Sequence, residues 1–318
     1  RIVIPSAGSN RGTPPIGARR VIVFSMNRSG GECPTAVRFT RHIRPYRSES
    51  ARVAILRERA MEYVQLGRST TQVPKIGFGT WQYRGGGGVL RRAHELGAAF
   101  VDTAEIYGTE AQVATDLDGL RDDFFIATKV SPQNLHHSDV LSHCAASLKR
   151  LATDRIDLYQ VHWPNPDIPI AETMRAMAEL VADGQVRYVG VSNYSVAQMQ
   201  EAQDALGDVP LVSNQVKYSL GAREIETDIL PYCQEHNITV IAYSPLAKGD
   251  FSGPGLERVA NIASARGKTP AQIMLNWLVS QPQVIAIPKT DRVERVDEAV
   301  GATGWTMDPA ERTALTSS

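Results

Sequence analysis

The sequence is poor in cysteine and contains no long apolar run. Its three cysteines, Cys33, Cys144 and Cys233, lie far apart in the 318-residue chain, without paired or metal-ligand spacing. We therefore expect inert thiols in a reducing compartment, the cytoplasm, and no disulfide framework. No run of about 18 apolar residues occurs, so we expect neither a transmembrane helix nor a membrane partner.

The chain also lacks net charge, but its two parts are charged in opposite senses. It carries 34 basic and 34 acidic residues in total. Residues 1–60 contain twelve arginines, no lysine and three glutamates, which gives +9, so residues 61–318 carry −9. Such a split is typical of a nucleic-acid-binding arm or an organelle-targeting segment.

Residues 1–60 show no sustained helical or strand period beyond the short run VIVF at 21–24. Met61 then opens MEYVQLGRSTTQVPKIGFGT, which is typical of a natural N-terminus. We favour a weakly ordered extension upstream of the true start. A transit peptide and a functional basic arm are the alternatives, and we expect no nucleic-acid partner.

From Pro74 onward, short apolar runs alternate with segments of helical periodicity. Several runs are almost continuously apolar, as expected of parallel strands that are buried on both faces. The eight predicted strands are KIGFGT (75–80), AFVDTA (99–104), FFIATKV (124–130), IDLYQVHW (156–163), VRYVGVSN (186–193), LVSNQVKY (211–218), ITVIAYSPL (238–246) and VIAIPKT (284–290). Strands that alternate with helices indicate an α/β fold, and eight units match a single (β/α)₈ (TIM) barrel over residues 61–318.

Amphipathic helices are predicted between the strands. The segments with the clearest apolar stripe are 138–152, 171–182 and 196–206. Ser138 and Ser195 are the expected N-caps of the first and third of these, and Thr269 with Pro270 begins a further helix. The segment EAQVATDLDGL (110–120) contains residues that disfavour a helix.

Four polar side chains, Asp102, Tyr107, Lys129 and His162, lie at or just beyond the ends of three successive predicted strands. A (β/α)₈ barrel places its active site at that face. Addition of a hydride to a carbonyl leaves charge on oxygen, which must be protonated or stabilised. An ammonium such as Lys129 lowers the pKa of a nearby tyrosine, while Asp102 compensates the buried Lys129 charge. The four residues favour general acid catalysis, although each alone is also compatible with a structural role.

The motifs around these residues resemble those of the aldo-keto reductase superfamily, in particular its bacterial NADPH-dependent members. The resemblance runs from Met61 to about Trp305 through GFGTW, VDTAEIYG, IATKV, DLYQVHWP, GQVRYVGVSNYS, VSNQVKYSL, VIAYSPLAKG and IPKT. It implies an enzyme that transfers a hydride from NADPH to a small aldehyde or ketone. It also implies that the four residues are the catalytic tetrad of the family, with Tyr107 as the proton donor.

The resemblance further implies where the nicotinamide end of the cofactor binds. The ligands of the carboxamide fall on Ser192, Asn193 and Gln215, and the aromatic residue that stacks on the ring falls on Tyr243. The segment near the pyrophosphate falls on Ser244–Leu246, including Ser244 and Leu246 themselves.

The adenosine 2′-phosphate is expected after the eighth strand. The matching positions are Lys289, Thr290 and Arg295, which favours NADPH over NADH. Basic side chains suit a phosphate there on physical grounds also, because barrels commonly bind phosphate around the loops after strands seven and eight. Glu298 matches the family, but Ala299 stands where the family often has asparagine and lacks the contacts of that amide with adenine.

The substrate pocket is the least defined part of the site. Trp81, Trp163 and Tyr194 are its predicted walls, although the two tryptophans also suit packing at the barrel rim. The loop AKGDFSGPG after the seventh strand is short, and the chain ends soon after Trp305. An open pocket with broad acceptance of small carbonyls is therefore expected.

Other functions are compatible with some features of the sequence. His136, His137 and Asp139 resemble metal ligands, but they lie at a helix start, so solvated side chains and no metal are expected. A regulatory subunit that binds cofactor, resembling the potassium channel β-subunits, would use residues 1–60 as its arm. A barrel lyase or isomerase would use Lys129 for a Schiff base. No feature of the sequence indicates an oligomeric state.

Overall fold

The structure of the protein is a computed structural model that describes residues 61–86, 88–247 and 254–316. All of these belong to the second of two units into which the chain divides, residues 47–318. The predicted extension 1–60 and most of the loop AKGDFSGPG lie outside the described residues.

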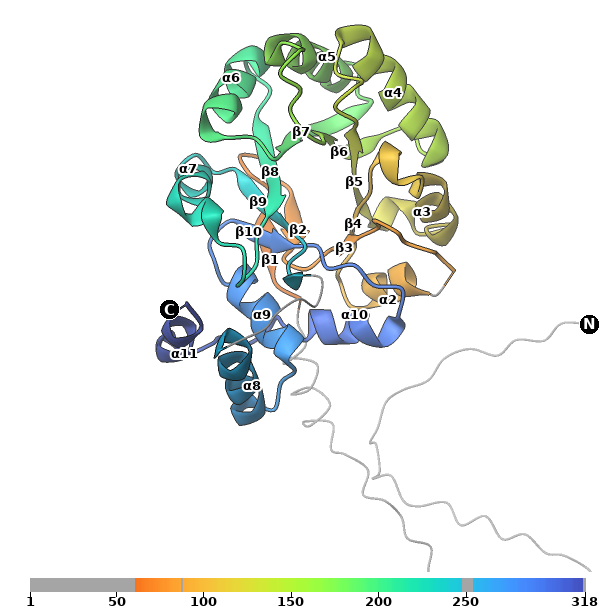
Figure 1. The fold of residues 1–318 in the computed structure, drawn as a ribbon. Coiled ribbons are helices and arrows are strands. Elements are labelled where there is room, and N and C mark those ends of the chain that lie inside the picture. The colour runs from red at the N-terminus through yellow and green to blue at the C-terminus, as the bar shows by residue number, and fades with distance from the viewer. Residues whose placement is uncertain (1–60, 87, 248–253, 317–318) are drawn as a thin grey trace, which may run out of the picture. The chain divides into compact units, whose positions relative to one another are not determined.

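Within the described residues, eight strands form one parallel sheet in which each strand pairs with its neighbours in chain order. They are β3 Phe78–Gly79, β4 Phe100–Asp102, β5 Phe125–Val130, β6 Ile156–Val161, β7 Val186–Ser192, β8 Leu211–Lys217, β9 Thr239–Tyr243 and β10 Val284–Ala286. Parallel bridges from Ile76 to Ala286 and from Gly79 to Lys289 join the two edge strands and close the ring seen in Figure 1. The predicted (β/α)₈ barrel and its strands are confirmed, with shorter strands at both edges.

The strand register brings polar residues of neighbouring strands side by side. Lys129 on β5 is in register with Gln160 on β6, and Ser192 on β7 with Gln215 on β8. Gly190 leaves room for this arrangement, because a Cβ atom there would lie 2.3 Å from the Ser213 hydroxyl and 3.0 Å from the Gln160 side chain. The register therefore lets amide side chains enter the barrel beside the lysine.

An antiparallel hairpin that the sequence analysis missed precedes the barrel. Its strands are β1 Tyr63–Gln65 and β2 Gln72–Pro74. Leu66 and Val73 of the hairpin are fully buried and share an apolar cluster with Phe100, Val212 and other residues of the barrel strands. The burial of such side chains stabilises the fold by about 1.5–3 kcal/mol each. The hairpin therefore contributes to the interior of the barrel.

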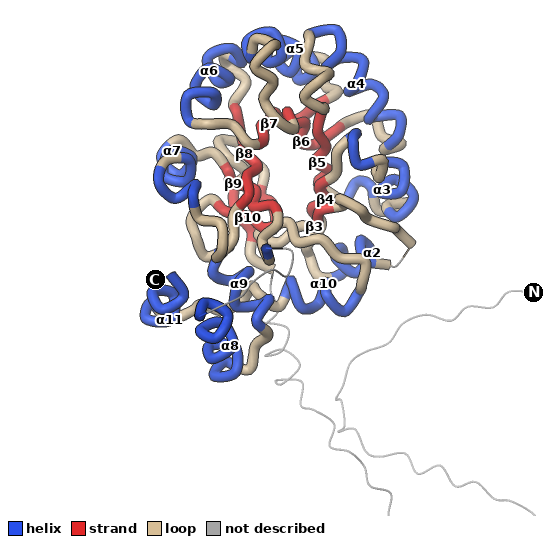
Figure 2. Tube along the Cα trace, in the orientation of Figure 1, coloured by secondary structure: helices blue, strands red, loops and turns tan. Residues whose placement is uncertain are grey.

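Helices surround the ring of strands, as Figure 2 shows in blue outside red. They are α2 Val89–Glu95, α3 Glu110–Asp116, α4 His137–Arg150, α5 Ile170–Ala182, α6 Val196–Leu206, α7 Ile229–Glu235, α8 Pro254–Arg266, α9 Pro270–Val279, α10 Val293–Val300 and α11 Pro309–Thr316, with 3₁₀ turns η1 Glu105–Tyr107, η2 Arg121–Asp123 and η3 Glu224–Thr227. The predicted helices are confirmed, and in the segment 110–120, which contains residues that disfavour a helix, α3 ends at Asp116.

The helix caps agree with the sequence in two cases and differ in one. Ser195 and Thr269 both form capping boxes, in which the side chain accepts from the backbone N–H three residues later. The prediction that Ser138 caps α4 is wrong, because α4 already begins at His137 and His136 is its N-cap. Ser138 therefore lies in the first helical turn.

Two histidines of α4 and its N-cap are paired with glutamates, and the two described cysteines are buried. His136 and His137 pair with Glu172 and Glu179 of α5, each at 3.0 Å. The described residues hold no group of three or more His, Cys, Asp or Glu placed for a metal ion, and none of their helices has the length and apolar character needed to cross a membrane. Cys144 and Cys233 are buried free thiols, and burial raises the pKa of each to about 12, which makes them inert as predicted.

Candidate active site

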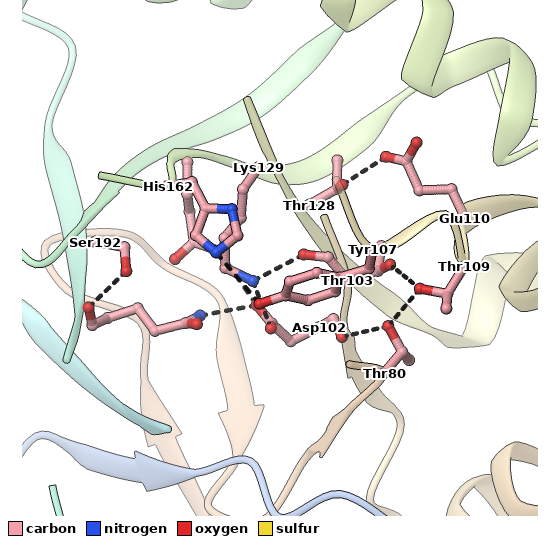
Figure 3. Close-up of polar contacts among 12 residues, drawn as sticks. Thr80, Asp102, Thr103, Tyr107, Thr109, Glu110, Thr128, Lys129, His162 and Ser192 are labelled. Carbon is pink, nitrogen blue, oxygen red and sulfur yellow. Dashed lines mark hydrogen bonds and ion pairs between the residues drawn. The ribbon is translucent and has the colours of Figure 1, made fainter. Parts of the chain in front are cut away.

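The tetrad side chains meet at the C-terminal end of the barrel, as Figure 3 shows. Asp102 is the last residue of β4, and Tyr107 ends the 3₁₀ turn η1 that follows it. Lys129 lies on β5, and His162 directly follows β6. Parallel strands in register present their carboxyl ends at one face, so residues separated by up to 60 positions converge there.

Lys129 and Asp102 form a buried ion pair. The Lys129 ammonium, which has no solvent-exposed surface, donates to the Asp102 carboxylate at 2.6 Å and to the Thr103 carbonyl at 2.8 Å. The other Asp102 oxygen accepts from the amides of Gln215 at 2.8 Å and Gln160 at 3.4 Å. Both buried charges are therefore compensated and hydrogen bonded, which is the condition for holding such a pair inside a protein.

Tyr107 lies between the ammonium and the imidazole. Its hydroxyl is 3.3 Å from His162 Nε2, and the Lys129 ammonium lies 5.1 Å from the centre of its ring. Burial raises the pKa of Tyr107, and the positive charge of Lys129 opposes this shift without reversing it. The predicted net lowering of the Tyr107 pKa is therefore not observed, because burial has the larger effect.

His162 is a neutral imidazole near pH 7. Burial, followed by repulsion from the Lys129 charge, lowers the pKa of His162 to about 4. Its Nδ1 atom is buried and meets no hydrogen-bond partner in the described part of the chain. The ring is therefore oriented by its contact with Tyr107 at Nε2, edge to face with centroids 5.3 Å apart.

A chain of hydroxyl groups holds the end of β4 in place (Figure 3). Thr80 donates to the Asp102 carbonyl at 3.0 Å, and Thr109 lies 3.1 Å from Thr80 and 2.9 Å from Thr103. These contacts fix the backbone on both sides of Asp102. They therefore restrict movement of the carboxylate that holds Lys129.

The residues predicted for the nicotinamide form one connected group. Asn193 donates to the Ser192 hydroxyl at 2.9 Å and to the His162 carbonyl at 3.2 Å, and Tyr243 donates to Asn193 at 3.1 Å. Asn193 and Ser244 adopt positive φ angles of 62° and 51°. Non-glycine residues in this region are strained, and such residues cluster at ligand sites.

A cavity of about 970 Å³ opens at this face and contains most of the predicted site. The predicted residues that line it are Trp81, Asp102, Tyr107, His162, Trp163, Ser192, Asn193, Gln215, Tyr243, Ser244, Leu246, Lys289, Thr290, Arg295 and Glu298. Lys129 lies behind this wall and reaches the cavity only through Tyr107 and Asp102. Three of the four tetrad residues and the predicted cofactor residues thus share one cavity.

A family model described as the aldo/keto reductase family matches residues 75–317. The chain belongs to the aldo/keto reductase family. It is 39% identical over 256 residues to methylglyoxal reductase YeaE of Escherichia coli, a match that covers 76% of the chain and 90% of that protein. Like its relatives, this aldo/keto reductase is an oxidoreductase.

Solved structures of aldo-keto reductases share its fold. The thermostable aldo-keto reductase Tm1743, in complex with the inhibitor epalrestat, is 38% identical with a TM-score of 0.77, over 80% of this chain and 99% of that one. An aldo/keto reductase from Klebsiella pneumoniae, in complex with NADP and acetate, is 38% identical with a TM-score of 0.73, over 80% and 94%.

One predicted pocket wall of this aldo/keto reductase lies elsewhere. Tyr194 does not reach the cavity, because its side chain is 1% exposed and packs in the apolar layer between barrel and helices. Asn214 binds its backbone, accepting from the Tyr194 N–H and donating to the carbonyl. Asn193, the residue before Tyr194, has a left-handed φ of 62°. Trp81 and Trp163 do line the cavity, and each is 48% exposed.

Glu105 anchors the turn that carries Tyr107, a role that we did not predict from the sequence. Its carboxylate accepts from the Ser131 backbone N–H at 2.7 Å, from Asn134 at 3.0 Å and from His143 at 2.7 Å. It lies in the same short turn as Tyr107 and connects that turn to the loop after β5 and to α4. The signal was present, since Glu105 stands between two tetrad residues in DTAEIYG.

We predict that Glu105→Gln lowers the free energy of unfolding by about 1–3 kcal/mol at pH 7. In the variant, the N–H₂ group of the glutamine side chain faces hydrogen-bond donors that bind a carboxylate oxygen in the wild-type protein. Burial favours a higher pKa of Glu105, but hydrogen bonds from Ser131, Asn134 and His143 outweigh it and lower the pKa below its usual 4.5. Such a group stabilises the folded state above its unfolded pKa and loses this effect as the pH falls.

Chemical denaturation of both proteins at pH 7 and below pH 4.5 measures this difference, which is expected to shrink at the lower pH. Glu172→Gln is the matched control, because Glu172 binds His136 on the protein surface. An equal loss in the two variants, or a loss that grows with acid, would contradict the role of Glu105.

Proposed function

We propose that the protein reduces small aldehydes or ketones with NADPH and that Tyr107 donates the proton. The observation that carries the proposal is one cavity lined by Asp102, Tyr107 and His162, by the amides of Asn193 and Gln215, and by basic residues at its other end. The reductase names of the relatives support it, as does NADP in the Klebsiella pneumoniae structure.

The cavity residues fit a nicotinamide dinucleotide with a 2′-phosphate. Beside the tetrad, Ser192, Asn193 and Gln215 offer hydroxyl and amide groups suited to a carboxamide, and Tyr243 offers a ring face. Away from the tetrad, Lys289, Thr290 and Arg295 would hold the phosphate, with Glu298 beside them. The cofactor, when bound, supplies the hydride.

The tetrad residues then have distinct roles. A carbonyl oxygen that lies beside the Tyr107 hydroxyl and His162 Nε2, within reach of both, can accept a hydrogen bond from each, because the two atoms are only 3.3 Å apart. The neutral imidazole orients the oxygen, and Tyr107 gives up its proton. Lys129 then stabilises the phenolate, while Asp102 keeps the ammonium in place.

The burial of Lys129 disfavours the alternative of a Schiff-base lyase or isomerase. A Schiff base requires a lysine that meets the substrate, and Lys129 is fully buried behind Asp102 and Tyr107. Its ammonium is also held by two hydrogen bonds. This lysine is suited to an electrostatic role.

The test is NADPH oxidation with a panel of small aldehydes, ketones and dicarbonyls, with methylglyoxal first because of the name of the Escherichia coli relative. We expect turnover of several members, since Trp81 and Trp163 leave the cavity mouth half exposed. If no carbonyl of the panel is reduced and NADPH stays tightly bound, the alternative function of a cofactor-binding regulatory subunit is favoured instead. A narrow preference for one carbonyl would contradict the open pocket.

We predict that kcat/KM for the carbonyl has no acid limb between pH 6 and pH 9, a window of about three units around neutrality. The pKa of His162 is lowered to about 4 by burial, so the imidazole stays neutral throughout this window, and the pKa of Tyr107 is raised, so its proton is retained. A pH profile at constant ionic strength measures this. A rate that falls as the pH drops from 7 to 6 would show that His162 is protonated there.

A further inference from the structure

We propose that Asp291 competes with the cofactor phosphate for Lys289 and thereby limits the preference of this enzyme for NADPH over NADH. The proposal rests on the proposed function, because it concerns the phosphate end of the same cavity. It assigns a specificity-determining role to a residue that does not itself line the cavity.

Asp291 is held on both of its carboxylate oxygens. One accepts from the Lys289 ammonium, and the other accepts from the backbone N–H of Arg84 at 3.2 Å. The side chains of Lys289 and Asp291 are 35% and 30% exposed, so a ligand can reach the lysine. Although burial favours a higher pKa of Asp291, these two hydrogen bonds lower it, and the group is a carboxylate at neutral pH.

The charge around this end of the cavity is nearly balanced. Residues 289–298 contain three basic and four acidic side chains. Lys289 and Arg295 are the basic side chains in the described lining of the cavity, and Lys289 already has an anionic partner. Arg292 lies 3.7 Å from Glu294. A phosphate dianion therefore meets less free positive charge than the three basic residues alone would provide.

Competition follows from these contacts. A phosphate that binds Lys289 must either displace Asp291 from the lysine or share the lysine with it. The Arg84 N–H keeps the Asp291 carboxylate close to the new anion. NADH carries a hydroxyl in place of the 2′-phosphate and has no such conflict. Asp291 should therefore weaken the binding of NADPH and leave the binding of NADH almost unchanged.

Removal of the Asp291 charge should leave the local fold intact. In Asp291→Asn the amide oxygen can still accept from Arg84, while the charge is lost. The loop that follows β3 has a second anchor, because Asp116 accepts from the Tyr83 hydroxyl at 2.7 Å and the Gly86 N–H at 3.1 Å. The substitution therefore isolates the electrostatic effect on Lys289.

The experiment titrates the full chain with NADPH and with NADH and follows binding by calorimetry and by tryptophan fluorescence, since Trp81 and Trp163 line the cavity. We expect Asp291→Asn to lower the Kd for NADPH about 3- to 10-fold and the Kd for NADH by less than about twofold, at low salt. Glu294→Gln, which removes the same charge nearby, should produce a smaller change. On a Lys289→Met background, the effect of Asp291→Asn should largely disappear.

The possible outcomes distinguish the role of Asp291 from the proposed reductase function. Unchanged NADPH affinity in Asp291→Asn, or equal tightening for both nucleotides, would overturn the role of Asp291 while leaving the reductase function in place. If the effect of Asp291→Asn persists on the Lys289→Met background, or if Glu294→Gln produces the same effect, the cause is the general electrostatic repulsion of the phosphate by acidic residues and not competition for Lys289. Failure of the wild-type chain to bind either nucleotide would overturn the proposed function together with this inference.

Discussion

Tyr107→Phe is expected to lower kcat for carbonyl reduction by about 10³-fold while NADPH binding remains, because general acid catalysis contributes about 10²- to 10⁴-fold. The change removes only the hydroxyl that lies 3.3 Å from His162 Nε2. The ring, its edge-to-face contact with the imidazole and the Lys129–Asp102 pair are retained. The remaining side chains can orient a carbonyl, but none of them replaces the phenol as an acid, because a neutral imidazole gives up its N–H proton far less readily.

Steady-state kinetics with one aldehyde, together with calorimetric titration of NADPH, measures the two quantities separately. Tyr188→Phe is the matched control, because the Tyr188 hydroxyl bonds Thr71 of the segment joining β1 and β2, away from the cavity. We expect that variant to keep its turnover. Full activity in Tyr107→Phe would refute the assignment of the proton donor.

Lys129→Met is expected to lower the free energy of unfolding by about 3–5 kcal/mol and to abolish turnover. The substitution leaves the Asp102 carboxylate buried, with only the neutral amides of Gln160 and Gln215 as side-chain donors. The double variant Asp102→Asn with Lys129→Met removes both charges and should recover most of the lost stability. It should not recover activity, since no ammonium then stabilises the phenolate of Tyr107.

Urea denaturation of the two single variants and the double variant gives the coupling energy of the pair directly. Lys75→Met provides the surface comparison, because Lys75 pairs with Glu62 at 2.8 Å where both side chains meet solvent. That change should cost no more than about 1 kcal/mol. If Lys129→Met lowers the free energy of unfolding by no more than Lys75→Met does, the buried ion pair is weaker than its geometry indicates.

Parts of the fold and site were readable from the sequence because their signals are local. Strands buried on both faces leave continuous apolar runs, such as FFIATKV, and the barrel order follows from their alternation with helices. Asp102 and Tyr107 occupy one short motif, so their proximity needs no tertiary information. Ser195 and Thr269 were predicted as helix starts for the same reason, since a capping box lies within four residues.

Other features arise only when distant segments meet. The N-cap of α4 depends on where the chain leaves the preceding loop, so Ser138 was a reasonable but wrong choice. Tyr194 follows a residue in the left-handed region, and its side chain lies in the apolar layer. The predicted effect of Lys129 on the pKa of Tyr107 was correct in sign for the charge alone, but burial decides the net direction.

The sequence by itself determined the barrel and the family, because periodicity and short motifs record them. It also indicated the four residues that we propose for catalysis and the positions that we propose for the cofactor. The tertiary structure alone decided which charges are paired. Glu105 with His143, and Asp291 with Lys289 and Arg84, are contacts whose strength depends on burial and on distances of a few ångströms. Electrostatic interactions change steeply with both. Tyr107 could therefore be proposed as the proton donor from the sequence, whereas the contacts around it and the charge balance at the proposed phosphate end required the folded protein.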